Sequence, residues 1–529
     1  MREFSASIFK NVSRGLRADD RIGRNTAYST LCKNIRPIVI DKQPGLSVYS
    51  PPSDPFASGY LTSMGISISH PFPQIFKGRE VTLLLDSSKI YQVAEGSDWT
   101  LTELDTKDAY DVGVDKEIVS GESWHFADMG TSFALFNGSC VVFKTNRISM
   151  FGGISDVLVA DDITVNTGCS DRGRLVLGGF NPSDFWNERW ESFLRRAFDS
   201  GLDFVFPASP GANFVWWSQI GDGAFFLFYP MDYILGNIKN NGEEIYSEDQ
   251  SILNEILVRN EMGFMPMRWQ GAVRRVLPLG NGFMVYGDNG VSYLKKAGNT
   301  FGLVDVLTHG VASRSSVGGT NSEHVFIDEA GWLWKVKADE APRRLGFREF
   351  LIDMLDNDIT ISYDTIEEDY YISDGERCFV LTRDEELFET TFLTTSLAIS
   401  GGGTVGVFDR PNDNEKEYAI LESDVIDFGL RSIKTIERIV VSATNTENVS
   451  VKVKWRYKSS DDWSETLWYP TNYEGIAYLP VKGLEFKIGV RCTDYGKVDL
   501  DNIVVHFKTD DKRIVRGTYA LENVARTGV

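Results

Sequence analysis

The stretch that decides the fold reads FMVYGDNGVSYLK and spans residues 283–295. Two apolar runs flank Asp288-Asn289-Gly290, whose residue types tolerate the positive φ angles that tight hairpin turns require. Five other stretches share this plan of apolar run, polar turn and apolar run. They are Val81–Val93, Ser132–Lys144, Phe214–Tyr229, His324–Val336 and Asp369–Leu381. Six similar hairpins over about 300 residues predict a radial repeat, and therefore a β-propeller.

The spacing of the turns divides this propeller into a regular and an irregular part. The last three turns lie at 288, 328 and 374, so they are 40 and 46 residues apart, close to the length of a four-stranded blade. The earlier turns, at 86, 137 and 221, are more widely spaced, which predicts insertions around 150–270. Helix starts are expected after Asn181 and at Ser247, and a third helix is expected over Gly346–Asp356. The glycine-rich run Ser400–Thr404 is expected to be a loop.

The period of the apolar residues changes near residue 424. Val449, Val451 and Val453 alternate with Lys452 and Lys454, as expected for strands with one buried face. Similar alternation continues beyond residue 500, which predicts an antiparallel β-sandwich.

The first 75 residues have neither pattern. Arg14, Arg17, Arg21 and Arg24 give this stretch a positive bias, and several prolines follow. The predicted fold is therefore mainly β, in four parts. They are an extended N-terminal arm at 1–75, a propeller with insertions at 76–415, a C-terminal β-sandwich at 416–512 and a tail at 513–529.

Composition argues against several classes of function. A net charge of −21 disfavours a surface that binds nucleic acid or an anionic membrane, because such surfaces need excess Lys and Arg. The five cysteines lack metal-ligand spacing and predict reduced, buried thiols. There is no run of about 18 apolar residues and no apolar segment near the N-terminus. We therefore expect synthesis and folding in the cytoplasm.

No catalytic pattern stands out. None of His125, His309, His324 and His506 lies in a metal-binding or nucleophile motif, and no GxSxG elbow is present. Three acidic clusters could supply the paired carboxylates of a glycosidase, but adjacent acids in turns are more often solvated. They are Asp161-Asp162, Glu367-Glu368-Asp369 and Asp384-Glu385-Glu386. We therefore predict no catalytic, cofactor-binding or metal-binding residue and no enzymatic activity.

Aromatic clusters are the remaining unusual feature. Trp216-Trp217 and Phe225–Tyr229 could form a shelf on which a sugar stacks, or two strands buried between blades. Trp463 and Trp468 could form a carbohydrate platform or pack at a sheet edge. Packing is the commoner outcome for both.

The order of the parts resembles a known family. An Arg-rich arm leads to Gln43-Pro44-Gly45-Leu46, hairpin blades follow, and the chain closes with a sandwich. The blades contain Trp124–Gly130, Val276–Gly287, Gly331–Trp334 and Asp369–Ile372, and the sandwich contains Asp424–Gly429 and Phe486–Ile488. This arrangement resembles the tail nozzle or tail-hub proteins of short-tailed bacteriophages, including those named packaged-DNA stabilisation proteins.

The resemblance implies a structural virion protein. It implies a homohexameric ring below the portal and adaptor, in contact with tail-tube proteins and with tail fibres or spikes. The ring's channel would retain packaged DNA and conduct it during ejection without binding it specifically. Two alternatives stay open, a carbohydrate- or receptor-binding tail protein and a propeller glycoside hydrolase.

Overall fold

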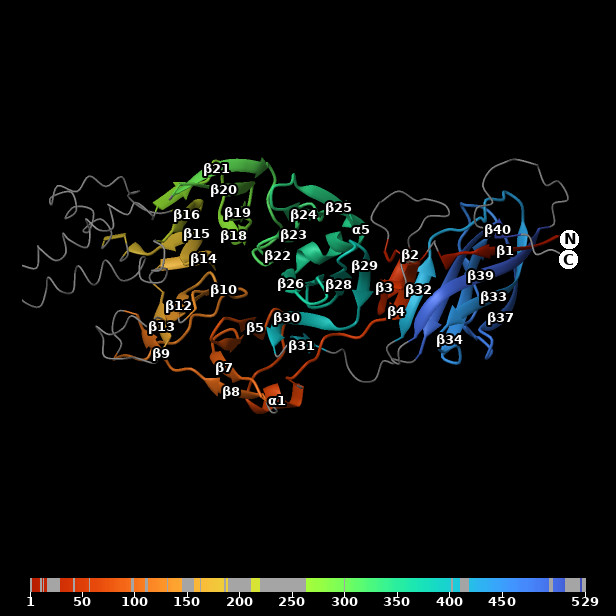
Figure 1. Cartoon of the computed structure of the whole chain (residues 1–529), viewed down its shortest axis with the longest axis horizontal. Coiled ribbons are helices and arrows are strands. Elements are labelled where there is room, and N and C mark those ends of the chain that lie inside the picture. Colours follow the sequence, from red (N-terminus) through yellow and green to blue (C-terminus); the bar gives the residue numbers. More distant parts are fainter. Residues whose placement is uncertain are drawn as a thin grey trace, which may run out of the picture.

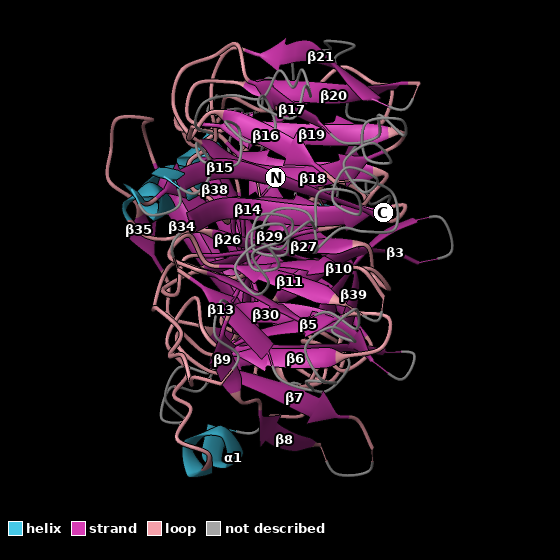
Figure 2. Ribbon diagram, turned by 90° about the vertical axis from the view of Figure 1, so that its left-hand side faces the viewer, coloured by secondary structure: helices cyan, strands magenta, loops and turns pink. Residues whose placement is uncertain are grey.

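The structure is a computed structural model of the whole chain. It describes residues 2–9, 12, 14–16, 29–40, 43–56, 58–96, 99–109, 113–130, 132–144, 157–161, 163–184, 187–188, 211–218, 263–298, 300–400, 403–409, 418–493, 498–509 and 524–525. In the part of the chain that the structure describes, strands dominate and the helices are few and short (Figure 2).

Four-stranded antiparallel sheets follow one another around a common axis (Figure 1). Blade 1 contains β5 (Gln74–Lys77), β6 (Thr82–Leu85), β7 (Ile90–Ala94) and β8 (Thr100–Glu103). Blade 2 contains β10 (His125–Asp128), β11 (Phe133–Phe136), β12 (Val141–Lys144) and β13 (Val157–Ala160), and β9 (Thr106–Asp108) pairs in parallel with β13. Blade 3 contains β14 (Ile163–Asp171), β15 (Arg174–Pro182), β16 (Phe214–Trp217) and β17 (Gly263–Pro266).

Three more blades and a hairpin complete the ring. Blade 4 contains β18 (Val273–Leu279), β19 (Gly282–Gly287), β20 (Val291–Ala297) and β21 (Thr300–Leu307). Blade 5 contains β22 (Val317–Gly319), β23 (Glu323–Ile327), β24 (Leu333–Lys337) and β25 (Arg343–Gly346). Blade 6 contains β26 (Thr360–Asp364), β27 (Asp369–Ser373), β28 (Cys378–Leu381) and β29 (Leu387–Thr390). The hairpin of β30 (Leu393–Ser400) and β31 (Gly403–Asp409) packs between blades 6 and 1, so the predicted propeller is confirmed.

Five of the six expected hairpins are present, and each is the second and third strand of a blade. These pairs are β6–β7, β11–β12, β19–β20, β23–β24 and β27–β28. The expected hairpin over Phe214–Tyr229 is wrong. Strand β16 pairs with β15 on one side and with β17 on the other, so residues 263–266 take the place expected for 224–229.

Side chains in the turns explain why these hairpins can be recognised locally. Asn137 Oδ1 accepts hydrogen bonds from the backbone N–H groups two and three residues further on, at 3.0 and 2.9 Å. Asp374 Oδ1 does the same at 2.9 and 2.7 Å. In both turns the next residue is a glycine with a φ of +83° or +86°, which a side chain would strain.

The β-sandwich is assembled from both ends of the chain. Its N-terminal strands are β1 (Arg2–Ser7), β2 (Ser29–Lys33), β3 (Ile35–Ile40) and β4 (Gln43–Val48). Its C-terminal strands are β32 (Ala419–Ser423), β33 (Lys434–Ala443), β34 (Val449–Arg456), β35 (Ser464–Glu465), β36 (Tyr469–Pro470), β37 (Ile476–Gly483), β38 (Glu485–Cys492), β39 (Asp499–Thr509) and β40 (Val524–Ala525).

The expectation of an extended arm at 1–75 is therefore wrong. Strand β1 pairs along β39 from Arg2↔Thr509 to Ser7↔Val504, and β2 pairs with β32. The end of the chain also contributes, because β40 pairs with β1, whereas a separate tail was expected at 513–529. Pairing between strands some 500 residues apart leaves no local signal.

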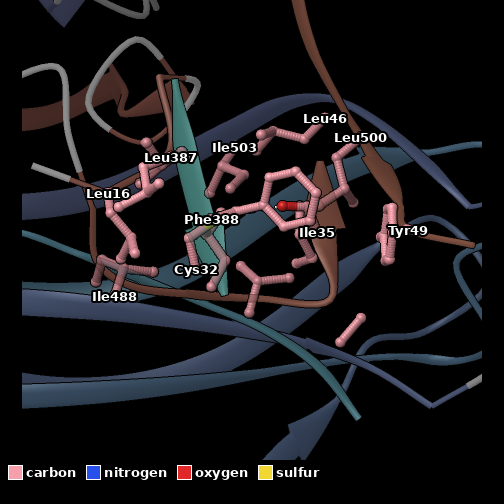
Figure 3. Packing of buried hydrophobic residues seen from close by; sticks show 14 of the residues in the cluster. Leu16, Cys32, Ile35, Leu46, Tyr49, Leu387, Phe388, Ile488, Leu500 and Ile503 are labelled. Carbon is pink, nitrogen blue, oxygen red and sulfur yellow. Dashed lines mark hydrogen bonds between the residues drawn. The ribbon is translucent and has the colours of Figure 1, made fainter. Parts of the chain in front are cut away.

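The two domains share a sheet and a hydrophobic core. Strand β2 also pairs with β29 of blade 6, so one sheet runs from the propeller into the sandwich. Figure 3 shows side chains from both domains packed together. Those labelled there include Leu16 between β1 and β2, Cys32, Ile35 and Leu46 from the N-terminal strands, Leu387 and Phe388 from blade 6, and Ile488, Leu500 and Ile503 from the C-terminal strands.

The helices among the described residues are short and connect strands. The expected third helix is confirmed as α5 (Arg348–Leu351) followed by the 3₁₀ helix η3 (Ile352–Asp356), with Leu351 and Met354 buried. Helix α1 (Ser58–Ser63) lies before blade 1 and was not expected. Most of the expected insertion, including the helix at Ser247, lies outside the described residues.

Candidate functional site

The acidic cluster at 367–369 joins the two domains through ion pairs. Glu367 and Asp369 both bind Arg36 of β3, at 2.8 and 2.9 Å, and Glu368 binds Arg383 at 2.9 Å. Asp369 is only 1% exposed, which corrects the expectation that these acids are solvated. Burial raises the pKa of Asp369 to about 7, and the charge of Arg36 opposes this shift.

The other acidic clusters also bind cations from neighbouring elements. Glu385 binds Arg343 of β25 and lies 3.6 Å from Lys335 of β24. Glu386 lies 3.5 Å from Arg14, the one residue of the set Arg14, Arg17, Arg21 and Arg24 that the structure describes. Asp161 binds Lys116 at 3.0 Å, and Asp162 lies outside the described residues. These contacts give the acids a role in joining strands.

Four of the five histidines, those considered in the sequence, occupy different places. His324 is fully buried between blades 4 and 5, where its Nδ1 lies 2.8 Å from the Tyr286 hydroxyl and its Nε2 lies 3.0 Å from the Pro278 carbonyl. His309 lies 5.0 Å from the Trp334 ring and 3.9 Å from Asp328. His506 lies in β39, and His125 is buried on the innermost strand of blade 2.

Thiols and metal ligands give no candidate centre in the described part of the chain. All five cysteines are buried, and burial raises the pKa of Cys140 to about 11 and that of Cys378 to about 12. Among the described residues, no three His, Cys, Asp or Glu side chains are grouped so that they could hold a metal ion. In the same residues, no helix has the length and apolar character needed to cross a membrane.

The paired tryptophans of blade 3 pack between strands. Trp216 is 4% exposed and lies against Phe180 and Phe264, and Trp217 is 3% exposed and lies against Phe301 of blade 4. The preference for packing is confirmed for this pair. Residues 225–229 lie outside the described part of the chain.

Cations cover the tryptophans of the sandwich. The guanidinium of Arg456 lies 4.4 Å from the centre of the Trp463 ring, and Lys487 lies 5.6 Å from it. Arg491 lies 4.8 Å from the centre of the Trp468 ring. These cation–π contacts on the outer face of β34 and β38 agree with packing, because they occupy aromatic faces on which a sugar would have to stack.

One segment of the sandwich, residues 457–478, exposes five large side chains with apolar surface. We call these side chains the 457–478 surface, after the segment that carries them. Tyr469 lies in β36, which pairs with β34, and Tyr478 lies in β37, which pairs with β33 of the other sheet. This surface contains Tyr457 (49% exposed), Leu467 (81%), Tyr469 (45%), Tyr473 (81%) and Tyr478 (64%). Tyrosine suits protein interfaces because it adds a large contact area and a polar end. The sequence analysis missed this surface, because exposure depends on which strands cover each other.

A groove of about 760 Å³ lies between blades 4 and 5. Its floor contains Leu279, Met284 and Val336, and Tyr293 also lines it. Four cations and two acids lie along it, so its local charge is opposite to that of the chain. They are Arg172, Lys295, Lys296, Lys337, Asp339 and Glu340. Such a groove suits an acidic segment with apolar side chains.

Comparisons with known proteins found solved structures of low identity and low TM-score. No family model matches the chain, and no curated protein matches it. The WD40 domain of Pan2 from Neurospora crassa has 7% identity and a TM-score of 0.33, over 66% of this chain and 94% of that chain. The WD40 β-propeller domain of Doa1 has 6% identity and a TM-score of 0.33, over 64% and 93%. AztD from Citrobacter koseri has 9% identity and a TM-score of 0.30, over 78% and 98%.

Proposed function

We propose that this chain is a non-catalytic structural protein of a bacteriophage tail. In this proposal, six copies form a nozzle or hub ring below the portal and adaptor, and the ring retains packaged DNA and conducts it during ejection. The protein would be made in the host cytoplasm and reside in the virion. The 457–478 surface carries the proposal, because a monomer has little reason to expose several large apolar side chains on one short segment.

Charge supports a conduit that does not bind DNA. Six copies at −21 carry about −126 in total, and acidic walls repel phosphates instead of holding them. DNA could not use the axis of one propeller, where Arg314 crosses between blades and the cavity measures about 150 Å³. The proposed channel therefore lies between subunits.

The first test is the mass of the assembly. Light scattering should give about 356 kDa for a hexamer, compared with 59.4 kDa for one chain. Changing Leu467, Tyr473 and Tyr478 together to Ser should shift the mass towards that of the monomer. A matched control changes three exposed apolar residues of the propeller, Val114, Ile366 and Ile399, to Ser and should leave the hexamer intact.

The second test is made in the particle. Virions carrying the wild-type chain should show it as a ring at the tail, and those carrying the Leu467, Tyr473 and Tyr478 triple variant should lose packaged DNA. A protein that stays monomeric and is absent from virions would overturn the proposal. Retention of the protein on host glycans, lost in Tyr473→Ala, would favour the carbohydrate-binding alternative.

A further inference from the structure

Strand β21 is the outermost strand of blade 4 and lies at the rim of the propeller (Figure 1, Figure 2). It has 8 residues, whereas the outermost strands β8, β13, β17, β25 and β29 have 4 each. In blades 2 and 6 the outer edge is paired, with β9 and β2. Among the described residues, no strand pairs with the outer edge of β21.

This edge lacks the usual protection against pairing with another chain. Exposed edges are commonly kept short or interrupted by Pro or by charged side chains. The strand Thr300–Leu307 contains no Pro, and its one charged side chain, Asp305, lies 3.3 Å from Arg268 and accepts a hydrogen bond from Ser292 at 3.1 Å. Val304 is apolar and yet 48% exposed. The backbone of β21 can therefore accept an additional strand.

The groove between blades 4 and 5 opens along the same edge. Met284 of β19, Tyr293 of β20 and Val304 of β21 are cross-strand partners, so they form one row on the face of blade 4 that lines the groove. The row runs from the buried Met284 to the exposed Val304. Gly302 lies beside this row, and a Cβ atom added there would meet nothing within 4 Å beyond its chain neighbours. The groove is therefore open to a strand that pairs with β21.

Two lysines give the groove an unbalanced positive charge. Lys295 and Lys296 are exposed, and no carboxylate of the described residues lies within 4.0 Å of either ammonium group. Arg172 and Lys337, the other two cations of the groove, each have a carboxylate within that distance. The two acids of the groove follow β24, on the side of blade 5. Because Lys295 pairs with Gly302, its charge lies at the open end of the apolar row.

We infer that the outer edge of β21 binds an extended acidic segment of a partner protein as an additional strand of blade 4. Main-chain hydrogen bonds to β21 would provide affinity, and every second side chain of the segment would point into the groove. Apolar side chains would lie beside Val304 and Val306, and a carboxylate beside Gly302 would face Lys295.

Charge argues against a second copy of this chain as the occupant. Pairing two β21 edges would bring two grooves with unpaired lysines together, and like charges across paired strands are unfavourable. The edge is also separate in sequence and in sheet from the 457–478 surface, so the inference does not depend on the proposed ring.

The probe for the first test is a capped synthetic peptide, Thr-Glu-Thr-Val-Thr-Val-Thr-Glu-Thr. As a strand it presents Glu-Val-Val-Glu on one face, whichever way it runs. Fluorescence anisotropy with the full chain should show saturable binding, and the same peptide with Lys in place of Glu should bind at least about tenfold more weakly. Val304→Asp should weaken binding of the acidic peptide at least about tenfold, because it places a carboxylate in the apolar row. The matched control Val119→Asp, at a valine that is 43% exposed, should bind as the wild type does.

Charge and backbone pairing can be tested separately. Lys295→Glu combined with Lys296→Glu should also weaken binding at least about tenfold. The control, Lys458→Glu combined with Arg431→Glu, changes the net charge equally at exposed residues of the sandwich and should leave binding unchanged. Hydrogen exchange should show amides of residues 300–307 protected when the peptide is bound.

Four results would overturn the inference. The first is an absence of saturable binding, and the second is equal binding of the acidic and basic peptides. The third is binding without protection over 300–307, because the peptide would then lie elsewhere. The fourth is a wild-type oligomer that light scattering shows to dissociate in Val304→Asp, because a second copy would then occupy the edge.

Discussion

Each propeller blade consists of strands that follow one another along the chain, whereas each sheet of the sandwich combines strands from the two ends. In blade 4, β18 to β21 pair in sequence order within 35 residues. In the sandwich, β39 lies between β33 and β1, and β1 comes from the first seven residues. Pairing between neighbouring strands costs little chain entropy, and the turn between them can be recognised in the sequence. Pairing between distant strands costs more chain entropy and involves no turn that the sequence could reveal.

The joint between the domains contains strands of the propeller and of the sandwich. Strand β2 pairs with β29 of the last blade and with β32 of the sandwich. It therefore joins blade 6 to one sheet of the sandwich. The hydroxyl groups of Tyr49 and Tyr371 lie 2.7 Å apart across this joint. We therefore expect the N-terminal strands to matter more for the sandwich than for the propeller.

Removing residues 1–50 should produce the largest effect. The sandwich would lose β1 to β4 and the partners of β39 and β32, so its sheets should not form. Hydrogen exchange should show protection lost over 418–509 and largely kept over 263–346. Unchanged protection in the sandwich would mean that residues 1–50 lie over a domain that is complete without them. That is the behaviour of the extended arm first expected at 1–75.

Arg314→Gln should show that the propeller also depends on distant contacts. The change leaves three buried carbonyl groups without a charged donor, so the free energy of unfolding should fall by about 4 kcal/mol. Denaturant unfolding measures it. The control Arg383→Gln removes an exposed arginine bound to Glu368, and we expect about 0.5 kcal/mol. Equal effects would contradict an axial role for Arg314.

Acid should weaken the contact between blades 4 and 5. Burial lowers the pKa of His324 to about 4, while the unfolded imidazole titrates near 6.5. As pH falls from 6.5 to 4, the unfolded chain takes up the proton first, so stability is lost, up to about 3 kcal/mol at pH 4. Urea unfolding at pH 7 and 4.5 should show a smaller loss in His324→Gln than in the wild type. The same loss in both proteins would exclude His324 as its source.

The smallest effect is expected in a single turn. Asn137 is fully buried, its Oδ1 accepts two backbone hydrogen bonds and its Nδ2 donates to Val119 at 2.8 Å, so Asn137→Ala should cost about 2 kcal/mol. The control Asn289→Ala loses one exposed hydrogen bond, to Gln270, and should cost about 0.5 kcal/mol. Thermal unfolding compares them, and a larger loss in Asn289→Ala would show that buried turn bonds do not define the blades.

Five hairpins could be predicted because each depends on neighbouring residues. An Asn or Asp that accepts backbone N–H groups, and a glycine or polar residue beside it, are visible in the chain before any packing is known. The Phe214 hairpin failed for the opposite reason, since its partner strand lies 45 residues away, beyond an insertion. The buried Trp216 and Trp217 were correctly interpreted because large aromatic side chains are usually core residues.

The residues alone predict the hairpins of five blades, the alternation of the sandwich strands and the acidity of the chain. The folded chain brings β1 to β4 into the sandwich and buries Asp369. Among the described residues, it also leaves both ring nitrogens of His125 without a hydrogen-bond partner. The physical reason is distance along the chain. Turn chemistry and periodicity act over a few residues, whereas burial and charge balance depend on groups that meet only after the whole chain has folded.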